Sequence, residues 1–338
     1  MSPIDLSCYT KEVEIEKLMP GDVLAHDIFL EQGLLLAPAG IRLTENHILR
    51  LKKTRKRVVT LDFSKVYEKA TKASRVLMLK AARGQPIEKK EVMEIVDPFI
   101  KEANREKNAA RLLIQLQSHD EYTFQHTVNI GVISMYIAKW LGYQDKNVLD
   151  ITLAGILHDI GKSKIPLAIL NKADKLNRVE FEIMKKHTIE GYKILSNYDS
   201  NIRLAVLQHH EREDGSGYPL GIKGNEIHPY AKIIAVVDVY HAMTSNRVYK
   251  NRVSPLQALD EMVKSLDQLE PEIIFTFVQK MLDFYTGCKV LLNNGKIGTI
   301  IYIDKNNISK PLIKVGDEEI VVDYKKTNGL GIDKILNV

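Results

Sequence analysis

Histidine and aspartate residues gather in the central part of this 338-residue chain. Five of its ten histidines lie there, each beside apolar, helix-like sequence: His126, His158, His187, His209 and His210. Asp159 follows one of them directly, and Asp238 lies further along the chain. One such histidine alone is usually a core or surface residue with satisfied hydrogen bonds, but several imidazoles and carboxylates buried together without partners are costly. The group therefore indicates a set of metal ligands.

The ligand types indicate which chemistry such a centre would perform. Imidazole and carboxylate groups suit iron, manganese or zinc at a hydrolytic site. A carboxylate in a His-Asp pair, here Asp159, can bridge two metal ions about 3.5–4 Å apart, an arrangement that activates water and binds a phosphate. Cys8 and Cys288 are too few and too far apart for a disulfide framework or a thiolate site, which fits a reducing compartment.

A glycine-rich motif follows the adjacent histidines. The sequence over residues 209–219 is His-His-Glu-Arg-Glu-Asp-Gly-Ser-Gly-Tyr-Pro. In this motif, in the order of the other ligands, and in Lys162 after the His-Asp pair, the chain resembles the HD-GYP branch of the HD phosphohydrolase superfamily over roughly residues 105–286. The resemblance implies an all-helical domain, a centre of two or three metal ions, and hydrolysis of cyclic di-GMP to linear pGpG, to GMP or to both.

The resemblance also implies a role for each ligand, with Asp159 shared between two metal ions. The first ion would be held by His126, His158, Asp159 and Asp238. The second ion would be held by Asp159, His187, His209 and His210. A hydroxide that bridges the two ions would attack phosphorus, so the expected catalytic residues are His158, Asp159 and Lys162.

Five residues are expected to contact the substrate: Lys162, Gly215, Gly217, Tyr218 and Arg247. The lysine and the arginine would bind phosphate, the guanidinium through two hydrogen bonds. The glycines permit backbone conformations that other residues resist, and the tyrosine would pack beside a guanine base. Two of the five have structural alternatives, because Lys162 could stabilise a helix C-terminus and Tyr218 could serve packing alone.

One departure from the family bears on the number of metal ions. Family members with a third ion carry an acidic ligand one helical turn before the first histidine, where this chain has Tyr122. We therefore expect two divalent transition-metal ions, iron or manganese before zinc, and leave a third ion open. Thr188 stands after His187 where proline is common in the family, which should not disturb ligation.

Two other functions compete with cyclic di-GMP hydrolysis. An HD phosphohydrolase could act on another cyclic dinucleotide, such as cyclic GMP–AMP, because the motifs do not select the base. A non-catalytic regulator that responds to a cyclic dinucleotide is the other alternative. Degenerate family members usually lose ligands, whereas this chain keeps every expected one.

The composition favours a soluble, globular protein and is compatible with an anionic substrate. The net charge of +5 and the pI of about 8.8 are mildly basic, so no nucleic acid polymer is expected as a partner. The basic run at 52–57 lacks interleaved aromatic residues and indicates a solvated surface. No apolar run approaches the roughly 20 residues of a membrane span, and the first residues lack a signal-peptide pattern. We expect a cytoplasmic protein that has no membrane partner.

The elements that position the ligands are expected to be helices. Five helices are predicted to carry the ligands or to lie beside them, at 127–141, 149–160, 180–195, 202–210 and 231–243. Such helices converge around metal sites in bundles. The predicted fold class is mainly α, an HD-domain bundle with a small β-rich N-terminal module and a small C-terminal β-subdomain. The predicted parts are the module at 1–62, a helical linker at 63–104, the catalytic domain at 105–285 and the β-subdomain at 286–338.

The flanking parts have weaker patterns. Strands are predicted in the module at 13–18, 23–30, 34–37 and 58–61, with a short helix after Thr44. Helices are predicted at 64–83, 89–103 and 105–117, where they could pack on the catalytic domain, link the domains, or join a homodimer or signalling partner. Strands are predicted in the β-subdomain at 289–292, 297–303, 312–315 and 319–322, with turns at Gly295 and Gly316.

Overall fold

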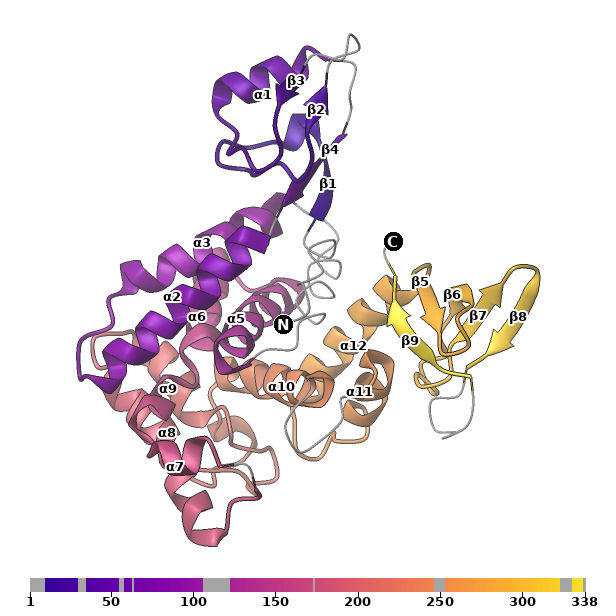
Figure 1. The fold of residues 1–338 in the computed structure, drawn as a ribbon. Coiled ribbons are helices and arrows are strands. Elements are labelled where there is room, and N and C mark those ends of the chain that lie inside the picture. Colours follow the sequence, from indigo (N-terminus) through magenta and orange to yellow (C-terminus); the bar gives the residue numbers. More distant parts are fainter. Residues whose placement is uncertain are drawn as a thin grey trace. The chain divides into compact units, whose positions relative to one another are not determined.

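The fold was analysed in a computed structural model of the chain (Figure 1). The structure describes residues 10–29, 35–54, 58–62, 64–105, 122–172, 174–245, 253–322 and 330–336. The chain divides into two compact units, Met1–Lys72 and Ala73–Val338. Helices dominate the second unit and short strands lie toward both ends of the chain, so the predicted fold class, mainly α with small β elements at the ends, is confirmed.

The described part of the first unit consists of short strands, short helices and the beginning of α2. Strand β1 (Thr10–Glu14) pairs antiparallel with β4 (Val58–Asp62), and β2 (Ile28–Phe29) pairs antiparallel with β3 (Leu35–Ala37). Helix α1 (Glu45–Lys52) begins with a capping box, in which the Thr44 side chain accepts from the backbone N–H of His47 and the His47 ring contacts the Thr44 backbone N–H.

Two strand predictions in this unit were too long. The strand predicted at 13–18 ends at Glu14, because the next residues form a 3₁₀ helix, η2 (Ile15–Lys17), closed by a hydrogen bond from Leu18 N–H to Ile15 C=O. The strand predicted at 23–30 is reduced to β2, and Val23 forms only an isolated bridge with Arg42. The apolar pattern of both segments is explained by burial in the small core, which does not require a continuous strand.

Helices α2 (Ser64–Ala82) and α3 (Lys89–Arg105) confirm the predicted helices at 64–83 and 89–103. Gly84, with φ of +72°, takes the left-handed conformation that ends α2. The Lys80 ammonium lies 2.6 Å from a carboxylate oxygen of Glu91 and so joins the two helices. The helix predicted at 105–117 falls almost wholly outside the described residues.

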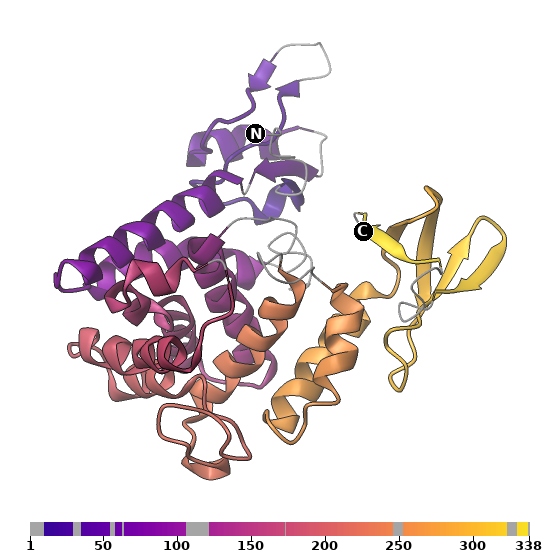
Figure 2. The same cartoon turned by 60° about the horizontal axis from the view of Figure 1, so that its bottom comes forward.

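The centre of the second unit is a helical bundle (Figures 1 and 2). Its elements are α5 (Tyr122–Trp140), α6 (Asp145–Leu157), η3 (Ile160–Lys164), α7 (Leu167–Leu170), α8 (Arg178–Ile194), α9 (Ser200–Gln208), η4 (Gly224–Glu226), α10 (Pro229–Thr244), α11 (Pro255–Met262) and α12 (Pro271–Tyr285). Helix α5 packs against α6 and α10, and α9 packs against α6, α8 and α10. Helices α5 and α10 are apolar on nearly every face because neighbouring helices surround them, which confirms the prediction of a buried core helix at 127–141.

The C-terminal strands form one antiparallel sheet in the order β8-β7-β6-β5-β9. Its members are β5 (Lys289–Leu292), β6 (Ile297–Tyr302), β7 (Leu312–Val315), β8 (Glu318–Val321) and β9 (Ile332–Ile335). Gly295 and Gly316 have positive φ in the two predicted hairpin turns. Strand β9 was not predicted, because it is a four-residue edge strand that pairs with β5, about forty residues earlier in the chain.

Among the residues that the structure describes, no helix combines the length and the apolar character that crossing a membrane requires.

Candidate metal centre

The His-Asp pair and the His-His pair both lie just past the end of a helix. Helix α6 ends at Leu157, and α9 ends at Gln208. The predictions of helices through 160 and 210 were therefore wrong at the C-terminal ends. Asp159, with φ of −99° and ψ of 7°, leaves helical geometry and leads into η3. Helix ends have unsatisfied backbone groups and free directions for side chains, so both pairs can turn toward a common point.

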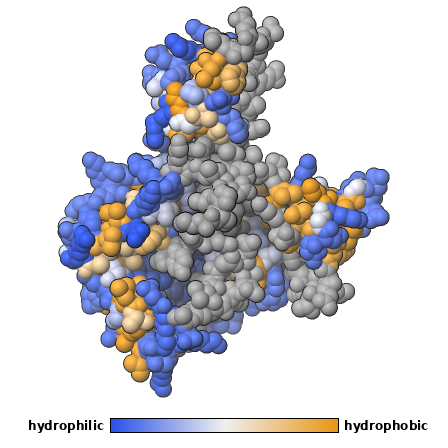
Figure 3. All heavy atoms as spheres, in the orientation of Figure 1, coloured by the Kyte–Doolittle hydropathy of each residue, from blue (hydrophilic) through white to orange (hydrophobic). Residues whose placement is uncertain are grey.

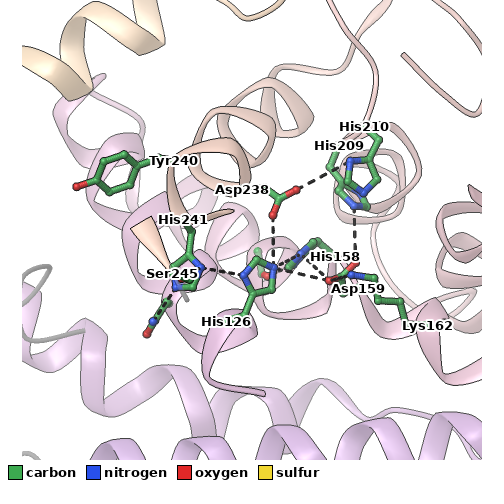
Figure 4. A network of polar contacts seen from close by, with 12 residues as sticks. His126, His158, Asp159, Lys162, His209, His210, Asp238, Tyr240, His241 and Ser245 are labelled. Atoms are coloured by element: carbon green, nitrogen blue, oxygen red, sulfur yellow. Dashed lines mark hydrogen bonds and ion pairs between the residues drawn. The ribbon is translucent and has the colours of Figure 1, made fainter. Parts of the chain in front are cut away.

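Asp159 lies at the middle of the centre, with one oxygen toward each group of histidines (Figure 4). Its Oδ2 atom is 3.2 Å from Nε2 of His158 and 3.7 Å from Nε2 of His126. Its Oδ1 atom is 3.4 Å from Nε2 of His187 and 4.0 Å from Nε2 of His209. A carboxylate placed in this way can share two metal ions.

Two groups of ligand atoms are close enough to hold an ion, each within a span of 4.8 Å. The first group is His126, His158 and Asp159. The second group is Asp159, His187, His209 and His210. Asp238 belongs to neither group, but its two oxygens lie 3.4 Å from Nε2 of His126 and 3.9 Å from Nδ1 of His210 (Figure 4). The structure thus brings all seven predicted ligands together, with Asp238 at the edge.

Three of the histidines are oriented by their own helices. The Nδ1 atoms of His158, His187 and His209 lie 2.8, 2.7 and 2.8 Å from backbone carbonyl oxygens three residues earlier. A carbonyl only accepts, so each Nδ1 carries the proton and donates it. In a neutral ring Nε2 then carries the lone pair, which is the form in which imidazole binds a metal. Nε2 of His158 also lies 3.2 Å from Oδ2 of Asp159.

Unpartnered polar atoms test whether the centre fits a metal ion. Among the described residues, Asp159 Oδ1, His187 Nε2 and His209 Nε2 are buried and have no hydrogen-bond partner. Leaving one such atom unsatisfied costs about 1–3 kcal/mol, and these three face one another. A divalent cation would satisfy all three lone pairs at once, so the residues fit a metal ion.

Comparison with known proteins agrees with this geometry. Residues 111–273 match the family model described as HD domain, and the Gly-Tyr-Pro sequence at 217–219 lies within that range. Residues 111–273 are therefore identified as an HD domain, and the Gly-Tyr-Pro sequence is the feature that resembles the HD-GYP branch. The HD-domain match contains the seven candidate ligands.

Several curated relatives are cyclic dinucleotide phosphodiesterases by name. The chain is 35% identical over 248 residues to cyclic di-GMP phosphodiesterase PA4108 of Pseudomonas aeruginosa, covering 72% of this chain and 60% of that protein. It is 43% identical over 166 residues to a cyclic di-GMP phosphodiesterase of Thermotoga maritima, covering 47% and 45%. It is 30% identical over 174 residues to 3'3'-cGAMP-specific phosphodiesterase 1 of Vibrio cholerae, covering 50% and 40%. The chain therefore spans between 40% and 60% of the length of these relatives.

The Gly-Tyr-Pro segment folds back over the second ligand group. Gly215 has φ of +81°, a conformation that favours glycine. Gly217 has no such φ, but a side chain there would collide with the backbone of His210, Glu211 and Arg212. The close fit brings the Tyr218 ring over His210, with ring centres 4.6 Å apart and planes tilted by 30°.

Glu211 holds this segment in place and was not singled out from the sequence. Its side chain is buried, and Oε1 accepts hydrogen bonds from the backbone N–H groups of Leu220, at 2.6 Å, and Gly221, at 3.2 Å. The residue follows the His pair directly, so its carboxylate links the ligand segment to the end of the GYP loop. The sequence did show an acidic residue directly after two ligand histidines. It could not show whether this carboxylate binds a metal ion or holds the loop.

A glycine also sets the distance between the His-Asp turn and α8. A side chain at Gly161 would collide with the carbonyl oxygen of His187 and the backbone nitrogen of Gly191. Glycine at this position therefore lets η3 approach α8 closely enough for Asp159 to reach His187. The next residue, Lys162, directs its ammonium to the centre, where Nζ is 2.6 Å from Oδ2 of Asp159 (Figure 4).

The charges of the centre keep most of its histidines neutral. Burial, followed by the neighbouring imidazoles, lowers the pKa values of His126, His209 and His210 well below the ordinary range. Burial lowers the pKa of His187 to about 4. His158 is the exception: burial opposes its protonation, but the adjacent Asp159 carboxylate outweighs burial and raises its pKa.

Asp159 itself stays ionised. Burial would raise the pKa of its carboxyl, but the charges of His158 and Lys162 outweigh burial and hold that pKa well below the usual range. Neutral imidazoles around one carboxylate leave the charge of a divalent cation largely uncancelled, which is the condition for a strongly acidic bound water.

The pKa of His187 predicts how the metal-free protein responds to acid. A histidine with an ordinary pKa of about 6.5 in the unfolded chain and about 4 in the folded chain favours the folded state fully above pH 6.5. That advantage is lost as the pH falls from 6.5 to 4, because the unfolded chain takes up the proton first. The shift corresponds to about 3 kcal/mol, and the three other lowered histidines act in the same direction.

Urea unfolding of metal-free protein at pH 7.5 and pH 5 would measure this loss. His158 acts oppositely, because its raised pKa favours the folded state at low pH. The His187→Gln variant should lose part of the pH slope, since glutamine does not titrate. Equal stability of the wild-type protein at both pH values would contradict the buried, neutral histidines.

Some predicted residues lie outside the described part of the chain. Arg247 is one of them, so its contact with phosphate stays a prediction. The side chain of Tyr122 is likewise outside the described part, so a third metal ion stays an open prediction. Thr188 is buried, and its hydroxyl donates to the carbonyl of Lys185, so it stabilises α8 next to His187.

Proposed function

We propose that this chain is a metal-dependent phosphodiesterase that hydrolyses cyclic di-GMP to linear pGpG, GMP or both, and that residues 105–285 form its catalytic domain. The observation that carries the proposal is the set of unpartnered ligand atoms, Asp159 Oδ1, His187 Nε2 and His209 Nε2, which converge from three separate segments. Two divalent ions, iron or manganese before zinc, would be held by the two ligand groups, with Asp238 completing the first.

Such ions supply two effects when bound: they lower the pKa of water and neutralise phosphate oxygens. The protein's own groups do the rest. The fixed Nδ1–H donations of His158, His187 and His209 hold the ligands in one orientation before substrate arrives. Lys162 supplies a cation for a non-bridging phosphate oxygen, and Arg247 would supply a second. Burial excludes competing water from the ligand atoms.

A surface beside the second ligand group suits a purine base. The Tyr218 ring packs on His210, and the Phe181 ring lies edge-on to Tyr218 with centres 6.0 Å apart. Phe181 is 43% exposed, and Lys185 Nζ lies 5.0 Å from its ring centre. Figure 3 shows apolar patches at the lower left of this face, where Figure 1 places α7 and α8. Aromatic faces and a cation suit a guanine, which stacks and accepts hydrogen bonds on its edge.

The names of the relatives support cyclic di-GMP as the substrate and offer cyclic GMP–AMP as a second candidate. The two relatives with 35% and 43% identity are named for cyclic di-GMP, whereas the 30% identical relative is named for 3'3'-cGAMP. Cyclic GMP–AMP is therefore the second candidate. A non-catalytic regulator is the weaker alternative, because loss of catalysis gives no reason to keep seven ligands in one buried cluster.

A panel of cyclic dinucleotides tests the proposal. Anaerobically purified, metal-loaded protein should hydrolyse cyclic di-GMP with a higher kcat/KM than cyclic GMP–AMP, with linear pGpG or GMP as product by chromatography. A preference for cyclic GMP–AMP would transfer the activity to the second candidate. Metal-loaded protein that binds a cyclic dinucleotide without cleaving it would establish the regulator instead.

A further inference from the structure

His126 is oriented differently from His158, His187 and His209. Its Nδ1 atom lies 3.0 Å from Nδ1 of His241, whereas the other three fixed histidines donate to carbonyl groups of their own helices. The His241 ring is buried, and Figure 4 shows it on the side of His126 away from Asp159. His126 thus depends on a residue of another helix, α10, for its orientation.

The partners of His241 come from α5 and from the end of α10, the two helices that carry the candidate ligands His126 and Asp238. Nδ2 of Asn129, one turn after His126 on α5, lies 2.9 Å from Nε2 of His241. The hydroxyl oxygen of Ser245 lies 2.9 Å from Nδ1 of His241. On α10, His241 follows Asp238 by three residues. Helix α5 therefore supplies the candidate ligand His126 and Asn129, and α10 supplies the candidate ligand Asp238 and His241. His241 lies behind His126, on the side away from Asp159 (Figure 4), and Asn129 contacts its ring.

We propose that His241 is a positioning residue of the metal centre: it accepts the Nδ1–H of His126, while Asn129 holds the proton of His241 on Nε2, so that His126 presents Nε2 to a metal ion. The proposal rests on the metal centre of the proposed function and not on its substrate.

The proton positions follow from the ligand role of His126. A neutral imidazole has one N–H, and an Nε2 atom that binds metal leaves that hydrogen on Nδ1. Nδ1 of His241 lies 3.0 Å from that Nδ1, so it must then accept the hydrogen and carry its own proton on Nε2. The Ser245 hydroxyl fits a proton on either ring nitrogen of His241, because a hydroxyl both donates and accepts.

Asn129 must then respond to the metal. In the structure its amide nitrogen faces Nε2 of His241, an arrangement that suits a proton on Nδ1 of His241. With a metal ion on His126, that amide has to turn by half a rotation so that its oxygen accepts from Nε2–H. Metal binding and the orientation of this buried amide are therefore coupled, although Asn129 touches no metal.

Variants at His241 separate hydrogen bonding from packing. His241→Asn places an amide oxygen close to the position of Nδ1 and should keep most of the affinity. His241→Leu fills similar space without an acceptor and should weaken the binding of one of the two ions by about 10- to 100-fold, the usual effect of removing such a partner. Mn²⁺ titration followed by calorimetry, together with metal analysis, would measure both the affinity and the number of ions.

Thr244→Val is the matched control. Thr244 is buried on the same helix, and its hydroxyl donates to the backbone carbonyls of Tyr240 at 3.0 Å and His241 at 3.5 Å, so it contacts the backbone of His241 and not the ring. This variant should bind both ions like the wild type. Circular dichroism and thermal unfolding would show which variants are folded before their metal binding is compared.

Variants of Asn129 test the same proposal independently if His241→Leu does not fold. Asn129→Asp supplies only acceptor oxygens and should bind Mn²⁺ at least as well as the wild type, whereas Asn129→Leu should bind one ion more weakly. Wild-type affinity for both ions in folded His241→Leu would overturn the proposal, and so would equal loss in His241→Asn and His241→Leu. Because Mn²⁺ binding is the readout, a wild-type protein that binds two ions without cleaving cyclic di-GMP would refute the proposed function alone.

Discussion

Replacing Asp159 by asparagine is expected to lower the occupancy of both metal ions and to reduce hydrolysis of cyclic di-GMP by more than about a thousand-fold. Its two oxygens face the two groups of histidines, so this one carboxylate serves both ions. An amide has one oxygen acceptor and no charge, and a thousand-fold loss corresponds to about 4 kcal/mol of transition-state stabilisation. Metal analysis and turnover of the same sample would measure the two effects together.

Asp150→Asn is a control for the effect of replacing a buried aspartate that binds no metal. Asp150 is also buried on α6, but its oxygen lies 3.8 Å from the Lys89 ammonium and outside the metal centre. This variant should keep both ions even if its stability falls. His210→Ala should reduce mainly the second ion, because His210 belongs to one group only. Near-normal turnover and full metal content in Asp159→Asn would show that the bridging assignment is wrong.

Replacing Lys162 by alanine is expected to leave the metal content intact and to lower kcat/KM for cyclic di-GMP by about 30- to 1000-fold. Its ammonium lies beside Asp159, where the scissile phosphate would bind, and it belongs to no ligand group. A charge-assisted contact that strengthens in the transition state is typically worth about 2–4 kcal/mol. Steady-state kinetics on metal-replete protein would measure the loss.

Lys164 is the matched control for this experiment. It lies on the same 3₁₀ helix, η3, but its ammonium donates to the carbonyl of Ala82 and does not reach the centre. Lys164→Ala should therefore show wild-type kinetics. Unchanged kinetics in metal-replete Lys162→Ala would mean that the lysine only stabilises the end of its helix, or that cyclic di-GMP is not the substrate. Running cyclic GMP–AMP in parallel separates these two explanations.

Residue types and their order were enough to predict which side chains meet at the centre. Histidines next to aspartate and next to each other in apolar sequence have few stable environments without a metal, so His158, Asp159, His209 and His210 were predictable. The position of these pairs just beyond the helices was not, because helix ends depend on local capping and packing that the apolar pattern does not encode.

The residues behind the ligands were harder to predict. His241 lies in an apolar helix, and its role arises only when α5 and α10 pack together and bring it to His126. Glu211 is similar, because its partners, the N–H groups of Leu220 and Gly221, become neighbours only when the loop closes. Contacts of this kind depend on tertiary structure rather than on local pattern, which also explains the shortened strands of the first unit.

The number of metal ions per chain, counted on samples whose turnover is measured in parallel, tests the central claim most directly. Protein loaded anaerobically with Fe²⁺ or Mn²⁺ should reach two ions per chain, and hydrolysis of a cyclic dinucleotide should rise as the second ion binds. A chain that saturates at one ion and is then fully active, or one that is fully active without metal, would contradict a centre in which Asp159 joins two ions.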